Sequence, residues 1–160
     1  MDKNTLLIKK PDTADWCELL SWFTNQEQFT QWAGPNLSIP QSATQLKSQL
    51  TANNVVNCAF TYNDKLAGFG QFTTKPTHIH LSRLAVSPSL RGKGLGKALV
   101  MALLTQANRT FRAKPASLFV YQNNKAALRC YEALGFTQTA LPDWASAAPG
   151  CLFMVRPYNC

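Results

Sequence analysis

The 160-residue sequence has no apolar run approaching the roughly 18 residues that a membrane-spanning helix requires. It has no Cys-x-x-Cys pair, and its 5 cysteines are an odd number, so we predict neither a disulfide framework nor a metal site. Internal repeats and low-complexity segments are also absent. The length and the 46% hydrophobic content favour one well-buried domain over residues 1–160.

Acidic residues are scarce, because 8 Asp and Glu stand against 16 Lys and Arg, for a net charge of +8. Such an excess is typical of proteins that bind nucleic acids, anionic surfaces or acidic ligands. The cations are dispersed, however, and several gather at one glycine-rich segment, so a nucleic-acid partner is not required. The first residues lack the long apolar core of a signal peptide, which predicts a cytoplasmic protein without membrane partners.

The glycine-rich segment carries the main functional signal, and from Leu84 to Lys97 it reads LAVSPSLRGKGLGK. An apolar strand ends near Pro88, and a helix begins at about Leu95. Glycines let backbone N–H groups converge on an anion, and a helix start adds free donors and the positive end of its dipole. The segment therefore predicts a phosphate-binding turn.

Two common nucleotide-binding loops do not fit this turn. A Walker A loop needs Ser or Thr after Gly-Lys, whereas Ala98 follows Lys97. A dinucleotide fingerprint needs a third glycine where Lys97 stands, and an acid about 20 residues further on, where the chain reads Lys114-Pro115.

What remains is the pattern R-x-x-G-x-G, made by Arg91, Gly94 and Gly96 after L-A-V-x-P. A second segment follows at the expected distance, with Asn124 starting a helix and Tyr131 seven residues later. Together the two segments resemble the GNAT-type N-acetyltransferase superfamily, which uses acetyl-CoA. The run Phe-x-x-Trp-Ala-Gly-Pro from Phe29 to Pro35 resembles a group of its small bacterial members.

The resemblance implies an α/β (α+β) fold: a mixed, mostly antiparallel sheet of about six or seven strands, splayed in the middle, with about four helices on both faces. Periodicity and turn signals agree with this order. They predict strands over 5–9, 57–62, 66–74, 78–86, 117–120, 136–141 and 151–156, helices after Pro11 and over 42–52, 95–108 and from Lys125, and irregular chain over 29–40.

The resemblance also assigns the donor site. Pantetheine is expected along the strand before the turn, pyrophosphate on the turn itself, and Tyr131 beside the sulfur as general acid. The residues expected to contact acetyl-CoA are Leu84, Ala85, Val86, Arg91, Gly92, Lys93, Gly94, Leu95, Gly96, Lys97, Asn124 and Tyr131.

The catalytic base departs from the family pattern. Many members carry a glutamate six residues before the Val of L-A-V, and this chain has His80 there. An imidazole near its ordinary pKa of about 6.5 accepts a proton at neutral pH. A water relay, or desolvation of the amine without any base, are the alternatives.

The resemblance places the acceptor pocket at the first two helices and the loop between the last strands, where this chain has the aromatic residues Trp22, Phe29, Trp32 and Trp144. Acids that would attract a polycation are sparse, so we expect a small amine, an amino acid or a peptide N-terminus. The rival interpretations are a catalytically silent acyl-CoA sensor of the same fold and a basic nucleic-acid-binding domain. A homodimer is expected only by analogy with the superfamily.

Overall fold

A computed structural model describes residues 5–52 and 54–158, which form one seven-stranded sheet and five α-helices. The strands are β1 (Leu7–Lys9), β2 (Val55–Tyr62), β3 (Lys65–Thr74), β4 (Ile79–Val86), β5 (Ala116–Tyr121), β6 (Thr137–Gln138) and β7 (Cys151–Arg156). The helices are α1 (Thr13–Ser21), α2 (Gln26–Ala33), α3 (Ala43–Leu50), α4 (Leu95–Thr110) and α5 (Lys125–Ala133). The predicted mixed α/β fold is confirmed.

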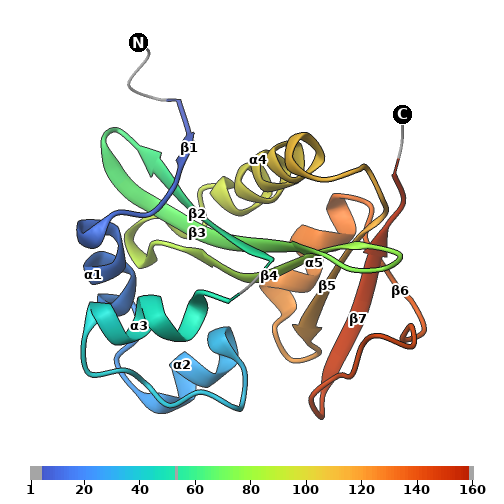
Figure 1. The fold of residues 1–160 in the computed structure, drawn as a ribbon, viewed down its shortest axis with the longest axis horizontal. Helices are drawn as coiled ribbons and strands as arrows, with labels where there is room; N and C mark the ends of the chain where they lie inside the picture. Colours follow the sequence, from blue (N-terminus) through green and yellow to red (C-terminus); the bar gives the residue numbers. More distant parts are fainter. Residues whose placement is uncertain (1–4, 53, 159–160) are drawn as a thin grey trace.

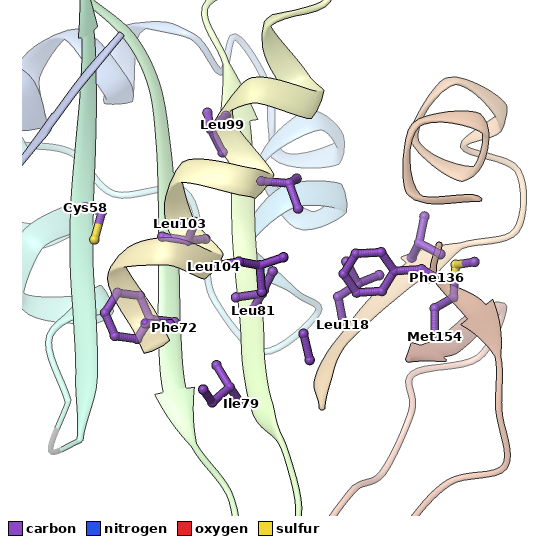
Figure 2. Close-up of a cluster of buried hydrophobic side chains, with 14 of the residues drawn as sticks. Cys58, Phe72, Ile79, Leu81, Leu99, Leu103, Leu104, Leu118, Phe136 and Met154 are labelled. Carbon is purple, nitrogen blue, oxygen red and sulfur yellow. The ribbon is translucent and has the colours of Figure 1, made fainter. Parts of the chain in front are cut away.

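The sheet runs in the order β1-β2-β3-β4-β5-β7-β6 and is antiparallel except between β4 and β5. Helices α1, α2 and α3 cover one face, and α4 and α5 cover the other (Figure 1). Each face has its own apolar core. The larger core lies under α4 and includes Phe72, Leu81, Leu103 and Leu118 (Figure 2).

The prediction of irregular chain over residues 29–40 is wrong at its start, where helix α2 forms. Asn25 caps this helix, because its side chain accepts a hydrogen bond of 2.9 Å from the backbone N–H of Gln28. Gly34, with a φ of 99°, ends it. The strand predicted over 136–141 is likewise reduced to β6, which pairs with β7 only at Thr137 and Gln138.

The sheet opens between β4 and β5. These parallel strands pair only at Ile79 with Ala116 and at His80 with Ser117. Beyond this point β4 is bulged, since its pairing with β3 shifts between Phe69 and Gln71. Bulges bend a strand and strengthen its twist. The second half of β4 therefore turns away from β5 and leaves one backbone edge facing an opening.

Two glycines of β3 let helix α4 approach the sheet closely. A Cβ at Gly68 would overlap the Leu99 side chain and lie 2.9 Å from the Ala85 carbonyl oxygen. A Cβ at Gly70 would lie 2.9 Å from both Leu103 and Leu84. The absence of a Cβ, above all at Gly68, favours this close packing of α4 beside the end of β4.

Candidate active site

The glycine-rich turn joins β4 to α4 through a short 3₁₀ helix, Pro88–Leu90. Gly92 and Gly94 both have a φ of 78°, a left-handed conformation that side chains with a Cβ disfavour. Within residues 5–52 and 54–158, the backbone N–H groups of Gly92, Lys93 and Gly94 have no hydrogen-bond acceptor. Gly94 caps α4 without any side-chain hydrogen bond. The turn thus presents unpaired donors at the positive end of a 16-residue helix.

Gly92 and Gly94 border a cavity of about 1000 Å³, which we call the donor cavity. It is lined by the turn, the end of β4 and the first half of α5. Arg91, Lys97 and Arg129 line it, and no Asp or Glu of the described chain does. The donor cavity therefore suits an anionic ligand.

All the predicted donor-site residues except Lys93 line this cavity. Lys93 is exposed on the turn and points elsewhere. Asn124 has a structural role as well, because its Oδ1 accepts a hydrogen bond of 3.2 Å from the backbone N–H of Ala127 and so caps α5. Its side-chain NH₂ remains available to a ligand.

A second cavity of about 460 Å³, the acceptor cavity, lies between the splayed halves of β4 and β5. Six residues line both cavities: Gln31, Trp32, Leu84, Asn124, Ala127 and Tyr131. The Tyr131 ring packs against Phe136, with ring centroids 5.9 Å apart. Burial raises the pKa of the Tyr131 phenol above its ordinary value, so the hydroxyl keeps its proton at neutral pH. A protonated phenol therefore stands where the cavities meet.

His80 lines the acceptor cavity but differs from the expected base. Its side chain is 8% exposed, and its Nδ1 lies 2.8 Å from the Ser117 hydroxyl. Burial, with smaller contributions from Lys75 and His78, lowers the pKa of His80 to about 4. The expectation of an imidazole near its ordinary pKa is therefore wrong. At neutral pH His80 is uncharged and a weak base.

Of the four aromatic residues predicted to bind the acceptor, two line a cavity and two do not. Trp32 lines both cavities, whereas Trp22 lines the donor cavity alone. Phe29 is fully buried in the core between α1, α2 and α3 and lines neither cavity, which corrects its assignment to the substrate. Trp144 also lines neither cavity. It lies beside His80, with ring centroids 5.7 Å apart, and its Nε1 donates to the Thr77 hydroxyl at 2.9 Å.

Two polar residues of the acceptor side were missed by sequence reasoning. Arg83 lines the acceptor cavity from the bulge of β4. Gln71, fully buried on β3, accepts a hydrogen bond of 2.9 Å from Arg83 Nη1. The available signal was that Arg83 is the one Lys, Arg, Asp or Glu between Thr77 and the turn.

Comparison with known proteins identifies the class to which this fold and site belong. The sequence model of the Acetyltransferase (GNAT) family matches residues 16–136, and the chain belongs to this family. The predicted membership of this family is thereby confirmed.

Individual curated relatives match this chain at low sequence identity and over only part of its length. The spermine/spermidine N(1)-acetyltransferase of Bacillus subtilis (strain 168) is 29% identical over 83 residues, which are 47% of this chain and 55% of that protein. The mycothiol acetyltransferase of Thermomonospora curvata is 38% identical over 87 residues, 53% of this chain and 29% of that protein. The chain thus spans about half or less of the length of these curated relatives.

Solved structures support the fold. The aminoglycoside acetyltransferase AAC(6')-Ib in complex with coenzyme A superposes with a TM-score of 0.73. It is 21% identical, over 96% of this chain and 95% of that one.

Two further properties concern the part of the chain that the structure describes. None of its helices combines the length and the apolar character needed to cross a membrane. None of its His, Cys, Asp and Glu side chains gather in threes as metal ligands would.

Proposed function

We propose that this protein transfers the acetyl group of acetyl-CoA to a primary amine, with both substrates bound at once. The observation that carries the proposal is the turn with unpaired N–H donors at Gly92, Lys93 and Gly94, of which Gly92 and Gly94 border a cavity lined by cations and by no Asp or Glu of the described residues. A pyrophosphate satisfies such donors. The donor cavity then leads to Tyr131 and opens there into a second cavity suited to an acceptor.

The donor fits the residues present. The turn and Lys97 would hold the phosphates, and the free edge of β4 from Leu84 to Val86 would pair with the amides of pantetheine. Asn124 would bind the same arm through its side-chain NH₂. Bound there, acetyl-CoA supplies an activated acetyl thioester.

The chain's own residues then have three tasks. The acceptor cavity orients an amine toward the thioester carbon, and nearness alone lowers the barrier substantially. The nitrogen attacks the carbonyl carbon, the C–S bond breaks, and Tyr131 gives its proton to the leaving thiolate; the second proton of the nitrogen is lost to water as the amide forms, and water returns a proton to the Tyr131 phenolate. Because His80 is a weak base, the ammonium loses its first proton to water before it attacks, and His80 acts as a neutral hydrogen-bonding wall of the cavity.

The test is the release of CoA thiol from acetyl-CoA in the presence of a panel of primary amines. We expect turnover with at least one amine, and Tyr131→Phe should lower kcat roughly 100-fold because the leaving thiolate loses its proton donor. The dissociation constant for acetyl-CoA should stay within about twofold. Tyr62→Phe, on β2 and lining neither cavity, is the matched control and should behave as wild type.

Tight binding of acetyl-CoA without turnover on any amine would instead identify the silent acyl-CoA-binding protein. Absence of binding would overturn the proposal altogether. Wild-type turnover by Tyr131→Phe would remove the proton-donor role.

A further inference from the structure

Arg83 has a backbone conformation that is costly for a residue with a long side chain. Its φ is 49°, in the left-handed region, in the middle of strand β4. The cause is the bulge, which lets Ser82 and Arg83 both reach the buried Gln71 of β3. The bulge therefore directs an arginine toward the acceptor cavity, where regular alternation along the strand would have directed it to the opposite face.

The guanidinium of Arg83 is held entirely by neutral groups. Its Nε donates to the Ala33 carbonyl oxygen at 3.1 Å, and its Nη1 donates to Gln71 Oε1 at 2.9 Å. Gln71 is itself fixed, because its Nε2 donates to the Leu50 carbonyl at 2.9 Å and to Asn57 Oδ1 at 2.6 Å. Contacts from α2, α3, β2 and β3 thus hold one cation in a defined orientation.

That cation has no anionic partner in the described chain. Among residues 5–52 and 54–158, the ion pairs are those of Lys9 with Asp12 and Asp15, and no Asp or Glu lines the acceptor cavity. A guanidinium has five N–H donors, and the two hydrogen bonds leave the others free. Burial also lowers the pKa of Arg83, in keeping with a positive charge that lacks compensation.

We propose that Arg83 binds a carboxylate of the acceptor, so that the substrate is a small amine that carries a carboxylate, as an amino acid does. This inference rests on the proposed acetyl transfer and narrows its acceptor. A carboxylate supplies the missing charge and accepts two parallel hydrogen bonds from one guanidinium. A cavity of about 460 Å³ is of the size that holds a small metabolite.

The same charges argue against polyamines and aminoglycosides as acceptors. A polycation would bring further positive charge to a half-buried arginine, and no Asp or Glu of the described residues lines the cavity to offset the repulsion.

The experiment compares kcat/KM for matched acceptors with wild-type protein: amino acids, their carboxamides, their decarboxylated amines, spermidine, and phosphoethanolamine as a phosphate-bearing amine. We expect at least one amino acid to exceed its own amide and amine by roughly 10- to 100-fold, the value of a charge-assisted hydrogen-bonded pair. Equal rates across each matched set, or a preference for spermidine, would overturn the proposal. A preference for phosphoethanolamine would overturn the carboxylate assignment.

Variants then test whether Arg83 is responsible. Arg83→Gln and Arg83→Lys should raise KM for the preferred amino acid about 10- to 100-fold, with little change in the affinity for acetyl-CoA. Arg109→Ala, at an exposed arginine of α4 that lines neither cavity, is the control. An unchanged preference in both Arg83 variants would refute the role of this residue.

The failure of this inference is distinguishable from that of the proposed function. If amines are acetylated without regard to a carboxylate, acetyl transfer stands and the acceptor assignment falls. If acetyl-CoA binds and no acceptor of the panel reacts, both fall. If the Arg83 variants fail to fold, the comparison of matched acceptors with wild-type protein still tests whether the acceptor must carry a carboxylate.

Discussion

Replacing His80 should change how the stability of this protein depends on pH. The imidazole is 8% exposed and packs among Phe119, Trp144 and Phe153, with ring centroids 5.2 to 6.5 Å from its own. Its burial lowers the pKa from 6.5 to about 4 in the folded protein. Between these two pH values the unfolded chain binds a proton that the folded protein does not.

The direction and size of the effect follow from this difference. Because the unfolded state binds more protons in this range, acidification from pH 6.5 to pH 4 favours unfolding. A decrease in pKa from 6.5 to about 4 corresponds to a loss of about 3 kcal/mol of the free energy of unfolding. That contribution is fully present above pH 6.5 and is lost as the pH falls through the folded-state pKa.

The assay is denaturant unfolding at intervals from pH 7 to pH 4.5, for wild type and for His80→Asn. Asparagine cannot titrate and still offers a polar atom to Ser117, so the decline of its stability should be shallower by roughly 1 kcal/mol per pH unit. His78→Asn is the control, since His78 is less buried and its pKa is lowered less strongly. Parallel curves for wild type and His80→Asn, or an imidazole that titrates near pH 6.5 by NMR, would refute the reasoning.

Three further predictions concern packing, thiol reactivity and pH dependence. Gly68→Ala should destabilise the protein by about 1–3 kcal/mol, because its Cβ overlaps Leu99. Gly96→Ala is the control and should leave the stability unchanged, because a Cβ there meets only Cys130 Sγ at 3.7 Å. Thermal unfolding of both variants tests this prediction, and equal stabilities would contradict it. Burial raises the pKa of the Cys58 thiol to about 12, so peptide-level alkylation at pH 8 should label the exposed Cys17 rapidly and Cys58 only after unfolding; equal labelling rates would contradict this burial. Because His80 is neutral above about pH 4 and Tyr131 keeps its proton, kcat/KM should rise with pH up to the acceptor's own pKa. If the rise in the pH–rate profile instead stays near pH 6.5 for acceptors of different pKa, the titrating group is a base of the enzyme.

The donor side of the site could be predicted from the sequence because its parts are contiguous. The end of β4, the glycine turn and the start of α4 follow one another along the chain, and Asn124 and Tyr131 lie on a single helix. Local rules of capping and of glycine conformation therefore suffice. The same rules would also have found α2, if Asn25 had been weighed as a cap against the glycine and prolines that follow.

The acceptor side depends on contacts between distant segments, which local rules do not reach. Arg83 meets Ala33 and Gln71, which lie 50 and 12 residues away, and His80 meets Ser117 across the parallel pair of strands. The pKa of His80 is set by this environment rather than by the residue type, so the expectation of an ordinary imidazole failed. Phe29 was assigned to the substrate from its place in the region where the resemblance puts the acceptor pocket, whereas packing of α2 buries it completely.

The most direct test of the account is amide hydrogen exchange with and without acetyl-CoA. We predict that protection increases at residues 92–94, whose turn borders the donor cavity through Gly92 and Gly94, and along the edge of β4 from Leu84 to Val86. Amides at the far edge of the sheet, in β1 and β2, should exchange unchanged. Binding that leaves residues 92–94 unprotected, or that protects a different surface, would contradict the account.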